Sequence, residues 1–372
     1  MMNSTPALSS IDDVISLIRP SVRNEHAYVV GAPSHCEVKL NQNESPFDLP
    51  ADLKEELAEA FTKIEANRYP DEQPTKLRNA LAERDGVDPE GIIVGNGSNE
   101  LTYTFGTAFI DPGTPVVMPR PMFSLYEKVA RICGADLTPV APSEDLSFDA
   151  GAIEKAVVET DAVMTVLTTP NNPTGLAMPM EEIEQIVSAA NGVVVVDEAY
   201  VEFNPVGSAT HLLEKYPNVV ILRTLSKGMG LAGVRLGYMI ARPELAHEVM
   251  KSRLPFMVDR FSEQIALSLL DREDLLAERV GLMKQATQKL IAALEEMPGV
   301  DVVPSDANFC IFRTDRDADA LQADLADAGV LVRNMSGYPE LPGYLRVSAG
   351  TEAENKAFLT ALERSLRGAD TA

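Results

Sequence analysis

The chain of 372 residues has no tryptophan, only three cysteines and only four histidines. Cys36, Cys133 and Cys310 are odd in number, far apart and without redox or metal-ligand spacing, so we expect reduced thiols and no disulfide framework. The histidines at positions 26, 35, 211 and 247 form no ligand set. These shortages argue against a disulfide-stapled scaffold and against metal catalysis.

Positive charge and long apolar runs are also scarce. The chain has 32 basic and 56 acidic residues, a formal charge of -24, whereas nucleic-acid and anionic-membrane binders need a cationic surface. No apolar run approaches the ~20 residues that span a bilayer, and residues 1–10 do not resemble a secretion signal. We expect a cytoplasmic protein without nucleic-acid or membrane partners. The acidity also suggests a salt-rich habitat, which unfolding measurements at low and high salt would test.

Short β-branched runs alternate with helical patterns through the middle of the chain. The runs are apolar throughout and lie at 91–95, 114–118, 162–167, 192–196 and 218–222. Such strands are typical of a mostly parallel sheet with helices on both faces. The fold class predicted is therefore α/β, and ligands are expected beyond the carboxyl ends of the strands.

The two ends of the chain have a different pattern. Ser9 or Ser10 can cap a helix that begins at Ile11 and stops before Pro20, and a second helix is expected over about 51–64. A long helical stretch is expected from about 262 to 296, followed by strands at 308–312, 329–333 and 344–348 and a final helix. The predicted organisation is an N-terminal arm and small-domain segment (1–44), a large domain (45–255) and a smaller α+β domain (256–372).

Two phosphate-binding motifs can be set aside. Asp197 and Glu198 follow a buried strand as in a magnesium-dependent nucleotide hydrolase, but no Gly-Lys dipeptide exists for the phosphate loop. The stretch Gly-Met-Gly-Leu-Ala-Gly at 228–233 matches the dinucleotide fingerprint, yet it leads into strand-like residues 234–240 and not into a helix. Neither motif has the context that its chemistry requires.

Polar residues gather instead at four strand ends. Ser98 and Asn99 follow Gly97 at the start of a helix, where free amide groups can bind phosphate. Thr224, Ser226 and Arg235 could donate to the same phosphate. This grouping supplies the local positive charge that the acidic chain otherwise lacks.

Asp197 and Lys227 complete a recognisable set. Asp197 ends a buried strand, where a carboxylate needs a cation or hydrogen-bond donors, and a protonated pyridine nitrogen would serve. Lys227, in Ser-Lys-Gly, could join the aldehyde of the same ligand as a Schiff base. Together these residues predict a site for pyridoxal 5'-phosphate.

With these motifs in place, the sequence resembles the fold-type I aminotransferases of the aspartate aminotransferase class, most of all the histidinol-phosphate aminotransferases. The resemblance runs from Leu-Asn-Gln-Asn-Glu at 40–44 through Arg-Tyr-Pro at 68–70 to Tyr-Leu-Arg-Val-Ser at 344–348. It implies that Lys227 holds the cofactor and later moves a proton, and that Asp197 keeps the ring nitrogen protonated. It also implies that Asn172 and Tyr200 contact the ring hydroxyl and that Phe123 stacks on the ring.

The same resemblance implies a homodimer, a small-molecule amino donor and a 2-oxo acid acceptor. Tyr69 would reach the cofactor phosphate of a second subunit. Arg346 matches the arginine that binds the α-carboxylate, and Arg333 matches a position that helps hold the substrate phosphate. Tyr28 corresponds to an N-terminal tyrosine that closes over the substrate, and Asn172 also faces the substrate. Arg333 can alternatively be explained as a surface ion pair.

Three departures from the family pattern leave the substrate open. Asn99 stands where aspartate is usual, Gly-Met-Gly at 228–230 replaces Ala-Phe-Gly, and Ser-Pro-Phe-Asp at 45–48 replaces Asn-Pro-x-Gly. The leading hypothesis is transamination of histidinol phosphate with 2-oxoglutarate in histidine biosynthesis. The alternatives are an aromatic amino-acid aminotransferase, a phosphoamino-acid decarboxylase of the same fold, and a non-enzymatic regulator on this fold.

Overall fold

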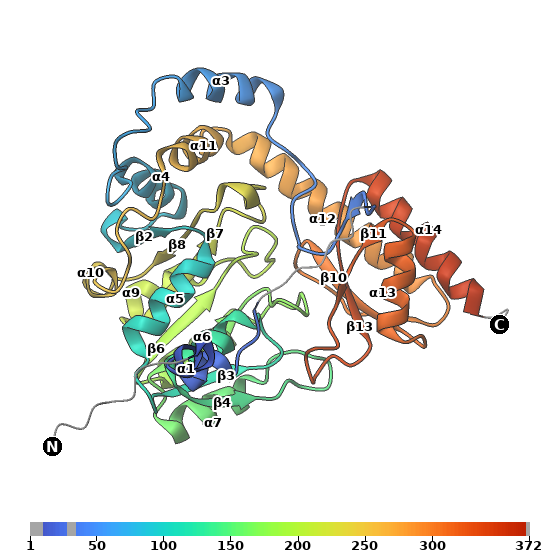
Figure 1. Ribbon diagram of the computed structural model, residues 1–372, viewed down its shortest axis with the longest axis horizontal. Helices are drawn as coiled ribbons and strands as arrows, with labels where there is room; N and C mark the ends of the chain where they lie inside the picture. The colour runs from blue at the N-terminus through green and yellow to red at the C-terminus, as the bar shows by residue number, and fades with distance from the viewer. Residues whose placement is uncertain (1–9, 28–34, 370–372) are drawn as a thin grey trace.

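The buried apolar runs form the centre of a seven-stranded sheet in the computed structural model, which describes residues 10–27 and 35–369 (Figure 1). The strand order is β2-β8-β7-β6-β5-β3-β4, and only β8 runs antiparallel to its neighbours. The strands are β2 (Ile92–Gly95), β3 (Pro115–Pro119), β4 (Asp136–Val140), β5 (Met164–Thr168), β6 (Val193–Asp197), β7 (Val219–Thr224) and β8 (Gly237–Ile240).

Five of these strands are the predicted ones, and β8 lies within the strand-like residues 234–240. Strand β4 did not appear as an apolar run, because it is a half-exposed edge strand containing Pro139.

Helices cover both faces of this sheet, as predicted. Val194 and Val196 of β6 pack in one core cluster, whereas Val195 packs in the other, because successive side chains of a strand point to opposite faces. The first face is covered by α3 (Ala51–Phe61), α4 (Thr75–Asp85), α7 (Ala150–Thr160), α8 (Met180–Ala189), α9 (Leu212–Lys215) and α11 (Arg260–Leu270). The second is covered by α5 (Ser98–Phe109), α6 (Leu125–Cys133) and α10 (Pro243–Met250).

A second, antiparallel sheet of order β12-β13-β10-β9 forms the smaller part, on the right of Figure 1. Its strands are β9 (Val300–Val302), β10 (Phe309–Thr314), β12 (Arg333–Asn334) and β13 (Tyr344–Ser348). It packs with α12 (Glu273–Glu295), α13 (Ala318–Asp327) and α14 (Glu352–Ala369). Strand β1 (Val38–Lys39) crosses into this part and pairs in parallel with β11 (Val330–Leu331). The aspartate aminotransferase-like α/β fold with a smaller α+β part is thus observed.

The helical stretch expected over 262–296 consists of two helices, α11 and α12, separated at Asp271 and Arg272. Leu269 and Leu270 of α11 pack in the core of the large sheet, and Leu275 and Leu276 in the first turn of α12 pack against the same core. Helix α12 also contacts β9 and β10 of the small sheet, so it passes from one sheet to the other. The predicted domain limits at 44 and 255 stay predictions.

The N-terminal arm contains two short helices, α1 (Ile11–Ser16) and α2 (Pro20–Arg23). Ser10 caps α1 through a capping box with Asp13, as the sequence predicted. Pro20 does not terminate α1, which has already ended at Ser16, but opens α2 at its first turn, where proline is favoured. Within the described residues, no helix is long and apolar enough to cross a membrane.

Candidate active site

Lys227 lies in the loop that joins β7 to β8. Its Nζ donates a hydrogen bond to the carbonyl oxygen of Gln42, at 2.8 Å. Burial is the main cause that lowers the pKa of Lys227 to about 7, and Arg346 and Arg235 lower it further while Glu44 opposes them. A large fraction of this amine is therefore neutral near pH 7, as a nucleophilic lysine requires.

Asp197 ends β6, opposite Thr168 of β5 in the sheet register. Its carboxylate accepts hydrogen bonds from the hydroxyl of Tyr126, at 2.7 Å, and from the backbone N–H of Ala199, at 2.9 Å. Burial raises the pKa of Asp197 to about 6 although both bonds act to lower it. A carboxylate in this position is stabilised by a cationic partner, such as a protonated ring nitrogen.

The start of α5 and the loop after β7 form a cradle for an anion. Gly97 precedes α5 with φ +75°, and a Cβ atom there would lie 2.5 Å from Nη2 of Arg235. Only glycine permits this approach of the guanidinium to the first turn of α5, where amide groups lack intrahelical acceptors. Thr224 and Ser226 lie beside each other, with their hydroxyl oxygens 3.0 Å apart.

Ser98 is the first residue of α5, and Asn99 is the second and is exposed. The predicted phosphate donors thus lie on the start of α5 and on the loop after β7, and these two segments meet where Arg235 approaches Gly97. Gly237 of β8 contributes to this approach, because a side chain there would collide with the backbone of Ser98. These groups meet the requirements of a phosphate site.

Arg346 and Asn172 join the two parts of the molecule. Arg346, on β13, donates to Oδ1 of Asn172 and to the carbonyl oxygen of Asn41, at 3.0 Å. Its guanidinium lies 5.3 Å from the ring centroid of Phe309. Arg346 is buried, and it contacts Asn172, which the sequence analysis expected to bind the cofactor.

Tyr200 lies in the loop after β6 and is buried. Its hydroxyl oxygen accepts a hydrogen bond from the amide of Asn43, at 2.9 Å, and its ring packs edge-on against Phe309. Burial raises the pKa of Tyr200 to about 12, with Arg346 lowering it. The phenol therefore keeps its proton at neutral pH and can act as a donor.

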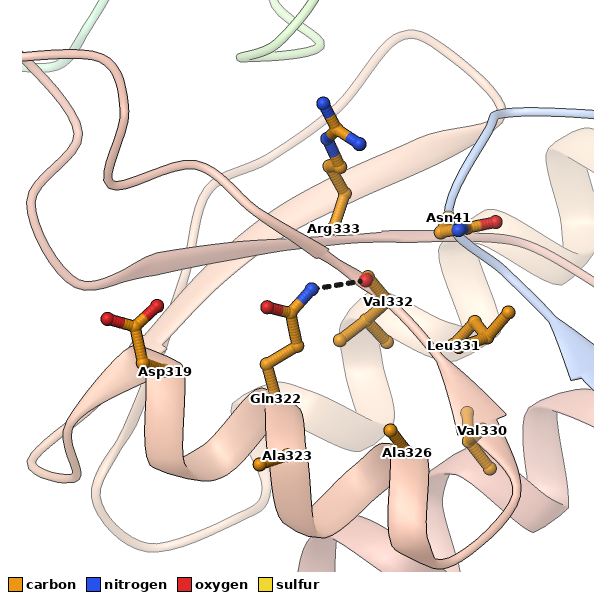
Figure 2. Close-up of a pocket in the computed structure, with 9 residues that line it drawn as sticks. All are labelled: Asn41, Asp319, Gln322, Ala323, Ala326, Val330, Leu331, Val332 and Arg333. Atoms are coloured by element: carbon orange, nitrogen blue, oxygen red, sulfur yellow. Dashed lines mark hydrogen bonds between the residues drawn. The ribbon is translucent and has the colours of Figure 1, made fainter. Parts of the chain in front are cut away.

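Arg333 stands directly opposite Arg346 in the antiparallel register of β12 and β13. Side chains of directly opposed residues leave a sheet on the same face. Figure 2 shows the side chain of Arg333 pointing away from Asp319 and Gln322 of α13. The two guanidinium groups therefore belong to the face that α13 does not cover.

A cavity of about 370 Å³ lies between α13 and strands β11 and β12, and Arg333 and Asn41 are among the residues that line it (Figure 2). Gln322 donates to the carbonyl oxygen of Val332, at 2.9 Å, along its wall. Neither Lys227, Asp197 nor Tyr200 lines this cavity. It is thus a feature of the small part and not the place where these three groups meet.

The remaining predicted residues divide into three cases. Phe123 lies beside the site, with its ring edge-on to Tyr126 at a centroid distance of 6.5 Å. Tyr69 is 78% exposed and stacks on Phe256, so within one chain it is not brought to the other groups. Tyr28 lies outside the described residues.

Two side chains at the site were not predicted. Tyr126 holds Asp197, and it lies in the first turn of α6, where its backbone N–H donates to the carbonyl oxygen of Phe123 at 3.2 Å. Asn43 holds Tyr200, and it belongs to the stretch 40–44 that carried the resemblance. Neither partner could be assigned from the sequence, because both contacts join residues more than 70 positions apart.

The arrangement fits pyridoxal 5'-phosphate. Its nucleophilic amine, its buried carboxylate with a raised pKa, and the anion cradle at α5 match an aldehyde, a basic ring nitrogen and a phosphate. No group of three or more histidine, cysteine or acidic side chains in the described ranges could hold a metal ion.

Known proteins with this architecture identify the class. The family model for "Aminotransferase class I and II" matches residues 37–362. The chain superposes on the Thermus thermophilus aspartate aminotransferase tetra mutant with a TM-score of 0.77, at 23% identity over 91% of this chain and 99% of the other. The chain belongs to the class I and II aminotransferases.

Within that class, the chain is 42% identical to the histidinol-phosphate aminotransferase of Chlorobaculum tepidum, over 94% of this chain and all of the relative. It is therefore a member of the histidinol-phosphate aminotransferase family. The crystal structure of the Sinorhizobium meliloti histidinol-phosphate aminotransferase in complex with pyridoxal-5'-phosphate superposes with a TM-score of 0.86, at 25% identity, covering 95% of this chain and 98% of that one.

Proposed function

We propose that the protein is a pyridoxal-phosphate-dependent aminotransferase that converts histidinol phosphate and 2-oxoglutarate to imidazole acetol phosphate and glutamate in histidine biosynthesis. The observation that carries the proposal is the opposed pair Arg333 and Arg346. Two guanidinium groups on one face of the small sheet make that face locally cationic, and Arg can bind a phosphate or a carboxylate with two parallel hydrogen bonds. The phosphate of one substrate and the carboxylate of the other are anions that this face would suit.

This arginine pair explains how one site can serve both half-reactions. The phosphate of histidinol phosphate and the α-carboxylate of glutamate are carried on the same side of Cα. Planar guanidinium groups bind either anion with two parallel hydrogen bonds, which an ammonium group cannot do. Asn172 accepts from Arg346 and so keeps the guanidinium at a constant position while the substrates exchange.

Around the cofactor, each residue would have one task. Asp197 would hold the ring nitrogen, and Asn172 and Tyr200 the ring hydroxyl, while Phe123 would cover the ring face. The phosphate would be held by Ser98, Asn99, Thr224, Ser226 and Arg235. When bound, pyridoxal 5'-phosphate supplies a ring that accepts the electron pair left at Cα of the substrate.

Lys227 would move the proton. Its amine, with a pKa lowered to about 7, can take the proton from Cα of the substrate and would deliver it to the carbon that carries the cofactor's aldehyde, because an acid or base with a pKa near the working pH is the most effective. Tyr126 keeps Asp197 hydrogen-bonded throughout, since burial raises the pKa of Tyr126 well above its usual range and the phenol stays a donor.

A homodimer is part of the proposal, with Tyr69 reaching the cofactor phosphate of the partner subunit. Tyr69 stacks on Phe256, which is 43% exposed, and the same stretch of chain exposes Leu254 (65%) and Phe261 (38%). An exposed apolar patch of this kind favours association with another subunit. We further place the protein in the cytoplasm, where its three free cysteines would stay reduced.

A substrate panel tests the proposal. Purified holoenzyme is offered histidinol phosphate, phenylalanine, tyrosine or aspartate, each with 2-oxoglutarate, and glutamate formation is measured. We expect the highest kcat/KM with histidinol phosphate. Ready conversion of the aromatic amino acids without any of histidinol phosphate would support the aromatic aminotransferase instead, and carbon dioxide release without a 2-oxo acid would support the decarboxylase. Sedimentation at several protein concentrations tests the dimer.

A further inference from the structure

Residues 41–43 contact three active-site side chains in succession. The carbonyl oxygen of residue 41 accepts a hydrogen bond from Arg346, at 3.0 Å, and that of residue 42 accepts one from Lys227, at 2.8 Å. The amide nitrogen of Asn43 donates to the hydroxyl oxygen of Tyr200, at 2.9 Å. A single short segment therefore contacts the anion-binding arginine, the reactive amine and the phenol.

This segment is built into the small part of the molecule, although Lys227 and Tyr200 belong to the large sheet. Its neighbour Leu40 donates from its backbone to Leu331, at 2.9 Å, and accepts from the backbone of Ser348, also at 2.9 Å. Figure 1 shows the corresponding blue strand among the orange and red elements. The backbone before Asn43 is therefore fixed to β13, the strand that carries Arg346.

The orientation of the Asn43 amide is set by Ser348. The backbone N–H of Asn43 donates to the Ser348 hydroxyl oxygen, at 2.8 Å, and that hydroxyl donates to Oδ1 of Asn43, at 3.2 Å. Asn43 is 1% exposed, and its φ of 54° lies in a region that asparagine tolerates better than most residues. Because its carbonyl side is occupied by Ser348, its NH₂ side faces Tyr200.

The direction of this hydrogen bond decides where the Tyr200 proton can go. A phenol has one proton, and an oxygen that accepts from Asn43 must donate its own proton to a different group. The titratable groups that act on Tyr200 are Arg346, Asp197 and Tyr338, but the direct hydrogen bond comes from Asn43. Phe309 restrains the ring, with its centroid 5.2 Å from that of Tyr200.

We propose that Asn43 is a positioning residue that makes Tyr200 a dedicated hydrogen-bond donor to the cofactor's ring oxygen. Ser348, Asn43 and Tyr200 form a directional chain from β13 to the cofactor. The inference rests on the proposed function, since it requires the cofactor to be the acceptor of the Tyr200 proton. It assigns the Asn43 side chain a role in the electronic state of the cofactor and not only in packing.

The test substitutes Asn43→Asp in the holoenzyme and measures its visible absorption as a function of pH. The aspartate keeps the shape of the side chain but accepts where asparagine donates, so it competes for the Tyr200 proton. A hydrogen bond donated to the ring oxygen favours the anionic form of that oxygen. Its loss should move the midpoint of the absorption titration to higher pH by about one unit.

The Tyr200→Phe background separates this role from the effect of added charge. Tyr200→Phe alone should raise the midpoint by a similar amount, and Asn43→Asp in that background should add little, since the chain is already broken. Ser348→Ala should give a smaller shift of the same sign, because it frees the Asn43 amide to turn. Asn218→Asp, at the other end of β7, is the matched control and should leave the midpoint unchanged.

Two results would overturn the inference. One is an unchanged midpoint for Asn43→Asp in a protein that keeps its visible band and melting temperature. The other is a full shift that persists in the Tyr200→Phe background. If Asn43→Asp does not fold, an unchanged midpoint for Ser348→Ala has the same consequence. A missing visible band in the unsubstituted holoenzyme would instead contradict the proposed function.

Discussion

The seven-stranded and the four-stranded sheets contribute different halves of the site. In the large sheet, Asp197 and Lys227 follow parallel strands whose carboxyl ends meet at one edge. In the small sheet, Arg333 and Arg346 lie side by side because the antiparallel pairing of β12 with β13 places them directly opposite each other. The large sheet therefore holds the groups proposed for the chemistry, and the small one holds the groups proposed for the choice of substrate.

This division predicts that changes in the large sheet affect every substrate. In the small sheet, loss of Arg346 should weaken every anionic substrate, whereas loss of Arg333 should affect substrates unequally. A one-residue slip in the small sheet would move Arg333 to the opposite face, since side chains alternate along a strand. In the large sheet, by contrast, replacing one side chain at the end of a strand should be enough to impair the reaction, without any change of strand register.

The largest effect is expected for Lys227→Ala. Turnover should fall by at least about 10³-fold with every amino donor, because the chain loses both its nucleophilic amine and its proton carrier. The visible absorption band of the holoenzyme should change as well. Lys155→Ala, an exposed lysine of α7, is the control and should match the unsubstituted protein. Unchanged turnover in Lys227→Ala would rule out the proposed mechanism.

Asp197→Asn should lower kcat by about 10²-fold for all donors, since the neutral amide cannot stabilise a protonated ring nitrogen. The same substitution should weaken cofactor binding, measured by dialysis followed by absorbance. Asn keeps the shape of the side chain and can still accept from Tyr126, so a loss of folding is not expected. Donor-dependent losses would contradict the assignment of Asp197 to the shared chemistry.

The arginine pair tests the other half of the comparison. Arg346→Gln should lower kcat/KM by about 10²-fold with both histidinol phosphate and glutamate, through the loss of two charge-assisted hydrogen bonds. Arg333→Gln should cost about tenfold with histidinol phosphate and less with glutamate, since the phosphate carries more charge. Arg313→Gln, on the exposed side of β10, is the control. Equal losses with both donors in Arg333→Gln would contradict the proposal that Arg333 discriminates between the two substrates.

The smallest effect concerns stability without cofactor. The pKa of Lys227 is lowered to about 7 from an ordinary value of 10.5, so the folded state binds fewer protons than the unfolded state between these values. Its contribution to stability is complete above about 10.5 and is lost as the pH falls through 7. Lys227→Met should therefore melt above the unsubstituted protein by about 2 °C or more at pH 7, and by less at pH 10. A difference that is constant with pH, as expected for Lys155→Met, would contradict this.

Much of the large sheet could be predicted because its strands are short, apolar and buried on both sides, a pattern that local sequence reveals. The phosphate cradle could also be predicted from local sequence, because Gly97 and Ser98 are typical of the start of a helix. The break between α11 and α12 could not be predicted, because no proline or glycine marks Asp271 and Arg272 and the apolar residues Leu270 and Leu275 on its two sides pack in the same core.

Contacts between distant segments were the other gap. Tyr126 and Asp197 lie 71 positions apart, and Asn43 and Tyr200 lie 157 apart. Each pair includes one residue that the sequence identified and one that it did not. Such hydrogen bonds form only where the fold brings two distant segments together, and this depends on the packing of the whole chain.

By itself, the sequence determined the class of sheet and predicted a pyridoxal-phosphate site at Lys227 and Asp197, because these depend on residue type at strand ends. Arg346 was predicted from the family resemblance. Only the tertiary structure decided that Arg333 opposes Arg346, that Tyr126 donates to Asp197 and that Asn43 directs Tyr200. Burial lowers the pKa of Lys227 and raises that of Asp197. It is likewise a result of packing and cannot be derived from the type of either residue.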